Sequence, residues 1–118
     1  MLSGADGALT KTPQNVVVLR GEDAVLNCST DRASLKGRNP INWKYDGDLI
    51  VSSPCTSHDK SKYIASPTDS PTDCNIRVSG SNATGISGAY SCEVVWFRTR
   101  AVAIVIVLGE LYRSVSLI

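Results

Sequence analysis

The chain has 118 residues, of which 42% are apolar and 19% charged, and its 12 basic and 11 acidic side chains leave a net charge of +1. This size fits one domain, the composition is too apolar for a disordered segment, and the charges are too balanced for electrostatic capture of nucleic acid. The longest apolar run, Ala101 to Leu108, is far shorter than the roughly 20 residues of a membrane-spanning helix. We therefore expect neither nucleic-acid binding nor membrane insertion by this segment.

Short apolar segments separated by turn-forming residues predict an all-β chain. The strands expected in its first half cover residues 16–19, 24–29, 41–45 and 48–51. Because alternate side chains of a strand point to opposite faces, Leu26 and Cys28 share one inward face and Trp43 points inward from the next strand. Asp46-Gly47 predicts a two-residue hairpin, since both central residues of a type I′ turn need positive φ.

The second half continues the pattern of short strands. The strands expected there cover residues 62–65, 74–78, 88–96 and 101–108. Residues 66–73 contain two prolines, which cannot join a ladder, so we expect a solvated loop. Tyr90 and Cys92 should point inward. Arg98 and Arg100 are expected at the tip of the last hairpin, as candidates to bind an acidic ligand.

Four cysteines allow three disulfide pairings, and they are Cys28, Cys55, Cys74 and Cys92. No pair has the spacing of a zinc or redox site, so we expect structural disulfides, no metal and an extracellular location. The single histidine, His58, lies in a polar loop, which predicts a solvated side chain. We expect no catalytic residues and no cofactor.

Trp43 follows Cys28 by 15 residues, and Gly88-x-Tyr90-x-Cys92 comes late in the chain. This framework resembles the variable-type domains of the immunoglobulin superfamily over residues 9–109. The resemblance implies a two-sheet Greek-key β-sandwich of V-type, in which a Cys28–Cys92 disulfide crosses the core. Trp43 and Leu26 would belong to that core. Tyr90 would form the tyrosine corner, and the long Cys28–Cys92 separation leaves room for strands C′ and C″.

The resemblance also has departures and consequences outside its framework. Ile86 stands where an acidic residue is usual, and no Phe-Gly-x-Gly element follows the last loop, which argues against an antibody or T-cell receptor chain. The chain looks closer to invertebrate or protochordate immune-type proteins and cell-surface receptor ectodomains. Cys55 and Cys74 would then form a second disulfide, the alternative being a bond from one of them to another chain. Residues 1–8 are interpreted as a leader remnant or tag, and 110–118 as a tail or linker.

Two sequons predict glycan acceptors in an extracellular protein, Asn27-Cys28-Ser29 and Asn82-Ala83-Thr84. Asn82 lies in a polar loop and is the better acceptor. Asn27 lies beside a cysteine that the resemblance places in a disulfide.

The last strand is apolar at both parities, whereas an antiparallel sheet with one wet face should alternate. Ile50 adds a second apolar parity to the strand expected at C′. In a variable-type domain strands G, F, C and C′ share one sheet, whose outer face would bind a partner. The expected interface consists of Val95, Phe97, Val105 and Val107, with Lys44 and Glu93 as polar neighbours. The alternatives are that residues 110–118 or a neighbouring domain cover the strand, or that it packs in the ordinary way.

The resemblance implies a non-enzymatic extracellular recognition or adhesion module. It would bind protein partners and form a homodimer through the GFCC′ sheet. The alternative is a secreted, variable-region, lectin-like protein that binds carbohydrate or microbial surfaces. A third possibility is a structural spacer with neither ligand nor dimer.

Overall fold

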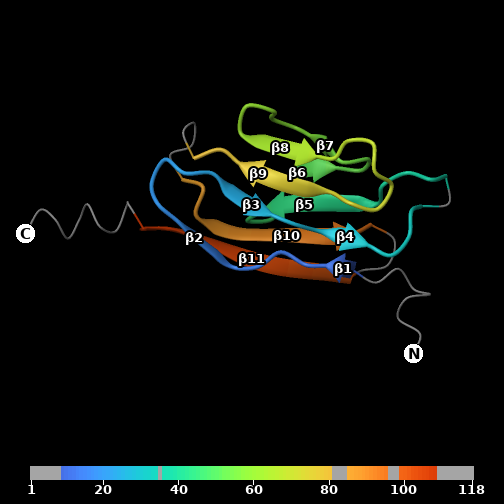
Figure 1. The fold of residues 1–118 in the computed structure, drawn as a ribbon, viewed down its shortest axis with the longest axis horizontal. Helices are drawn as coiled ribbons and strands as arrows, with labels where there is room; N and C mark the ends of the chain where they lie inside the picture. The colour runs from blue at the N-terminus through green and yellow to red at the C-terminus, as the bar shows by residue number, and fades with distance from the viewer. Residues whose placement is uncertain (1–8, 35, 81–84, 96–98, 109–118) are drawn as a thin grey trace, which may run out of the picture.

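The computed structural model describes residues 9–34, 36–80, 85–95 and 99–108, which form eleven strands. They are β1 (Leu9–Lys11), β2 (Val16–Val18), β3 (Ala24–Leu26), β4 (Ser29–Thr30), β5 (Ile41–Tyr45), β6 (Asp48–Ser52), β7 (Thr56–Ser57), β8 (Tyr63–Ser66), β9 (Asn75–Val78), β10 (Gly88–Val94) and β11 (Thr99–Val107). β2 and β11 lie along one long side of the molecule, and β7 and β8 lie along the other (Figure 1).

The strands form a β-sandwich, as expected. One sheet has six strands in the order β2-β11-β10-β5-β6-β7, and a second has the order β3-β9-β8 with a separate β1-β4 pair beside them. Strands β11, β10, β5 and β6 therefore adjoin in the order expected of G, F, C and C′. Their pairings are antiparallel, while β2 runs parallel to β11.

The core lies between the sheets and contains the residues that the alternating pattern selects. Leu26, Trp43 and Tyr90 are fully buried. Trp43 and Cys92 are direct partners across β5 and β10, so they point to the same inner face. The prediction of these core residues is confirmed.

Both expected disulfides are present, Cys28–Cys92 and Cys55–Cys74, and none of the described cysteines is free. The indole Nε1 of Trp43 donates a hydrogen bond of 2.8 Å to the carbonyl oxygen of Cys74. This bond satisfies the buried polar atom of the tryptophan and ties the core at Cys28–Cys92 to the second disulfide.

The hairpin between β5 and β6 has the predicted turn, because Asp46 and Gly47 have φ of 47° and 93°. The pairing then shifts by one residue between Trp43 and Lys44, which are opposite Val51 and Leu49. Such a bulge buries Ile50 and leaves Leu49 40% exposed. The outward apolar residue of this strand is thus Leu49, and the expectation for Ile50 is wrong.

The loop at residues 67–74 is better anchored than a solvated connection. The side-chain Nδ2 of Asn39 donates to the carbonyl oxygens of Ser70 and Asp73, at 3.0 and 2.8 Å. Thr30 N donates to the carbonyl of Thr72 at 2.9 Å. These contacts hold the loop against residues 30–40, so part of its backbone is paired with protein rather than water.

Candidate binding surface

The outer face of β11 is apolar, but at the parity opposite to the one predicted. Val102, Ile104 and Ile106 are 50%, 40% and 42% exposed. Val105 and Val107 are buried, with exposures of 1% and 6%, so their assignment to an interface is wrong. The reason is the register: Ala101 and Ala103 are opposite the inward Cys92 and Tyr90, and alternation carries the same inner face to Val105 and Val107.

The exposed residues of β11 continue onto β2. Val17 is opposite Ile106 and is 55% exposed. We refer to Val17, Val102, Ile104 and Ile106 as the apolar stripe. Asn15 supports it, because its side-chain Oδ1 accepts the N–H of Ile104 at 2.8 Å.

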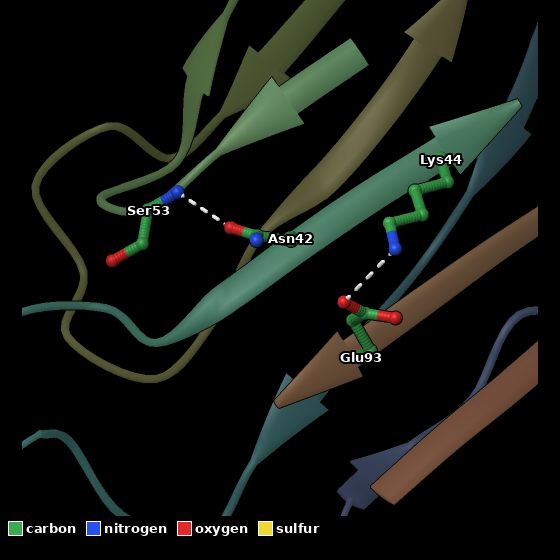
Figure 2. A network of polar contacts seen from close by, with 4 residues as sticks. All are labelled: Asn42, Lys44, Ser53 and Glu93. Carbon is green, nitrogen blue, oxygen red and sulfur yellow. Dashed lines mark hydrogen bonds and ion pairs between the residues drawn. The ribbon is translucent and has the colours of Figure 1, made fainter. Parts of the chain in front are cut away.

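The centre of the same sheet face, over β10 and β5, is polar. Lys44 Nζ lies 3.5 Å from Glu93 Oε2, and Asn42 Oδ1 accepts the backbone N–H of Ser53 at 2.8 Å (Figure 2). The ion pair is partly exposed, so water screens it and it adds little to stability. The sheet face therefore has an apolar stripe at one side and a polar centre, with Leu49 exposed opposite Lys44 on β6.

The remaining predicted surface residues fall into two groups. Val95 directly follows β10, is 42% exposed and donates its N–H to the Pro40 carbonyl at 3.0 Å. Arg100 lies on β11 opposite Glu93, so it stands on the strand and not at the hairpin tip. Phe97, Arg98 and Asn82 lie outside the described residues.

The tyrosine corner is present, because Tyr90 Oη donates a hydrogen bond of 2.6 Å to the carbonyl oxygen of Ile86. Burial raises the pKa of the Tyr90 phenol above its usual value. Ile86 is itself buried, so the position that usually carries an acidic residue adds to the core. Tyr45 packs beside Tyr90 with ring centroids 4.7 Å apart.

Two side chains, those of Tyr45 and Asn39, make buried or partly buried hydrogen bonds that the sequence does not predict. Tyr45 Oη contacts the carbonyl oxygens of Ser87 and Gly85, at 2.7 and 3.1 Å. Asn39 is buried, and its Oδ1 accepts the N–H of Ile41 at 3.0 Å. An asparagine in a polar loop carries no sequence pattern that distinguishes a buried anchor from a solvated residue. Only the tertiary contacts reveal the difference.

The described residues were expected to include no acid–base catalyst and no metal ligands, and the side chains concerned lie as follows. His58 is exposed, and its Nε2 lies 2.9 Å from Ser52 Oγ. Within residues 9–34, 36–80, 85–95 and 99–108, no three His, Cys, Asp or Glu side chains gather where a metal ion could bind. Over those same residues, no helix has the length and apolar character to cross a bilayer.

No protein-family model matches the sequence, and no curated protein matches it. Solved structures do match. The RIG-5 IG1 homodimer superposes with a TM-score of 0.68 at 16% identity, covering 86% of this chain and 96% of that one. Domain I10 of titin superposes with a TM-score of 0.65 at 17% identity, covering 86% of this chain and 97% of that domain. The Ig1 domain of mouse SynCAM 2 superposes with a TM-score of 0.63 at 20% identity, covering 80% of this chain and 91% of that domain. Together with the sandwich, its inter-sheet disulfide and its tyrosine corner, these likenesses show that the chain has the immunoglobulin fold.

Proposed function

We propose that the chain is a non-enzymatic extracellular recognition module that binds protein partners, including a second copy of itself, through the outer face of β11, β10, β5 and β6. The observation that carries the proposal is the apolar stripe, on a face where an antiparallel sheet is ordinarily polar. A contiguous exposed apolar patch rimmed by polar residues is typical of interaction sites. The similar RIG-5 IG1 structure is a homodimer, which supports self-association.

The energetics favour weak and reversible association. Fully burying a Val or Ile side chain yields about 1.5–3 kcal/mol, so four half-exposed side chains on each of two copies yield roughly 6–12 kcal/mol. Association costs about 4–15 kcal/mol or more in lost freedom. The stripe would thus form the dry centre of the interface. Lys44, Glu93 and Arg100 would lie at its polar rim and favour a partner whose charges are arranged to complement them.

Sedimentation velocity over a concentration series tests the proposal. We expect a monomer–dimer equilibrium that Ile104→Asp abolishes, because a carboxylate at the centre of the interface would be desolvated. Val25→Asp is the matched control, since Val25 is 53% exposed on β3 in the other sheet. A wild-type chain that stays monomeric at millimolar concentration, or dimerisation unchanged by Ile104→Asp, would refute the self-association.

The proposed extracellular location is supported by the two disulfides, which persist in oxidising compartments. Asn27 is exposed and is a proposed glycan acceptor together with Asn82. Mass spectrometry of the chain secreted from eukaryotic cells would show glycan mass on either asparagine. A V-type assignment is also part of the proposal, because β7 extends the large sheet beyond β6.

A further inference from the structure

A hollow of about 530 Å³ is lined by residues of β7 and β8. These two strands lie on the opposite long side of the molecule from β2 and β11, the strands that carry the apolar stripe (Figure 1). β7 is an edge strand of the six-stranded sheet, and β8 is an edge strand of the three-stranded sheet. Ser57 Oγ donates a hydrogen bond of 2.6 Å to the carbonyl oxygen of Tyr63. This bond joins the two strands next to the turn at residues 58–62. The hollow is therefore bordered by one open edge from each sheet.

The backbone of β8 presents hydrogen-bonding groups to this hollow. Ser79 N donates to the carbonyl of Lys62 at 2.9 Å, so Lys62 faces β9. Paired residues of antiparallel strands alternate in direction, and Ala65, three positions on, therefore turns its N–H and C=O away from β9. Ala65 lines the hollow, and this alternation leaves its N–H and C=O outside the β8–β9 ladder, on the open edge of the sheet.

The same reasoning applies to β7. His58 N donates to the carbonyl of Ile50 at 2.9 Å, so His58 faces β6. Alternation turns the neighbouring peptide groups of Ser57 away from β6 and toward β8. Both strands that border the hollow thus direct backbone polar groups toward it.

The side chains around the hollow add apolar walls and a positive charge. Pro54 and Tyr63 supply apolar surface, and Lys60 supplies an ammonium group from the turn. Asp59 lies beside Lys60, but its Oδ1 accepts hydrogen bonds from the hydroxyl and N–H of Ser61, at 2.7 and 3.2 Å. The turn at residues 58–62 also carries Lys62, so two lysines outnumber this one carboxylate, and Lys60 is the lysine that lines the hollow.

We propose that the hollow binds an extended peptide segment of a partner protein, which pairs with the edge of β8 at Ala65 and directs an acidic side chain to Lys60. An added strand supplies an acceptor and a donor for the N–H and C=O that Ala65 presents on this edge. Its small apolar side chains contact Pro54 and Tyr63. The site is separate from the apolar stripe, so it would add a second partner to the proposed recognition module.

The test is an NMR titration of the isotope-labelled full chain with a capped hexapeptide of alternating valine and glutamate. Binding should shift the amide signals of Lys60, Ile64 and Ala65 and slow hydrogen exchange of the Ala65 amide. Lys60→Glu should weaken binding at least tenfold and reverse the preference toward a valine–lysine hexapeptide. Shifts confined to Val102, Ile104 and Ile106, or no shifts at millimolar peptide, would overturn the proposal.

A second variant separates strand pairing from charge. Ala65→Pro removes an N–H that faces the hollow and no bond of the β8–β9 ladder, so the chain should remain folded and lose peptide binding. Ala65→Val keeps the N–H and should bind as the wild-type chain does. Undiminished binding by Ala65→Pro would contradict pairing at this edge. Ile104→Asp should leave peptide binding unchanged, so this result is independent of the dimer experiment.

Discussion

At the scale of single residues, Gly88 shows how one position constrains a strand. Its φ is 146°, and a Cβ there would lie 2.8 Å from Cε1 of the Tyr45 ring. The next residue, Ala89, donates its N–H to Asp46 Oδ1 at 3.0 Å. Glycine is therefore required where β10 passes the hairpin of β5 and β6.

Gly88→Ala should lower the free energy of unfolding by about 1–3 kcal/mol, because the new methyl group displaces the Tyr45 ring from Tyr90. Urea denaturation measures the change. Gly37→Ala is the control: Gly37 also has positive φ, at 76°, but no atom lies within 4 Å of the added Cβ. Equal losses in the two variants would show that backbone conformation alone matters.

The buried phenol of Tyr90 predicts loss of stability in alkali. Burial raises its folded-state pKa above the ordinary 10.0, so only the unfolded chain ionises as the pH passes that value. The unfolded state then binds fewer protons than the folded state, and the free energy of unfolding falls as pH rises above about 10. Denaturant midpoints at pH 9 to 11.5 should fall steeply for wild type and less steeply for Tyr90→Phe. Parallel curves would remove Tyr90 as a cause.

At the scale of elements, β11 shows why a pattern of apolar residues can leave orientation open. Both parities are apolar, and a shift of one residue exchanges the inner and outer faces. Cross-strand pairing resolves the ambiguity, because Ala103 is opposite the buried Tyr90. By contrast, β5 and β10 have one dominant inward set, Trp43 on one strand and Tyr90 with Cys92 on the other. Their orientation was predictable.

The parity of β11 can be tested on stability. Val105→Asp buries a carboxylate in the core and should cost several kcal/mol, enough to unfold a marginal domain. Ile104→Asp changes an exposed position, so the monomer should lose no more than about 1 kcal/mol. Thermal denaturation followed by circular dichroism, at a concentration low enough to exclude dimers, distinguishes the two. A larger loss in Ile104→Asp would reverse the assignment of faces.

At the scale of the whole molecule, two cross-links close loops of different length. Cys28–Cys92 spans 64 residues and Cys55–Cys74 spans 19. In the chain-entropy model they stabilise the fold by about 4 and about 3 kcal/mol.

Replacing Cys28 and Cys92 together by alanine should therefore cost more than replacing Cys55 and Cys74. The first pair also leaves its cavity beside the buried Trp43, which adds to the difference. Guanidinium denaturation of the two double variants ranks them. If the variant without Cys55–Cys74 were the less stable of the two, loop length would not set the ranking. The Cys55–Cys74 disulfide would then stabilise the fold mainly by holding the loops that it joins.

The sequence by itself determined the all-β class, the Asp46-Gly47 turn and the inward positions of Leu26, Trp43 and Tyr90, because each follows from local alternation or turn stereochemistry. The framework of Cys28, Trp43, Tyr90 and Cys92 added the sandwich and its disulfides by resemblance. Tertiary structure alone decided which face of β11 is exposed, the bulge that buries Ile50, the anchoring role of Asn39 and the hollow between β7 and β8. Each of these depends on the register between strands or on the meeting of sheet edges distant in sequence, and neither is encoded in the spacing of residues along one segment.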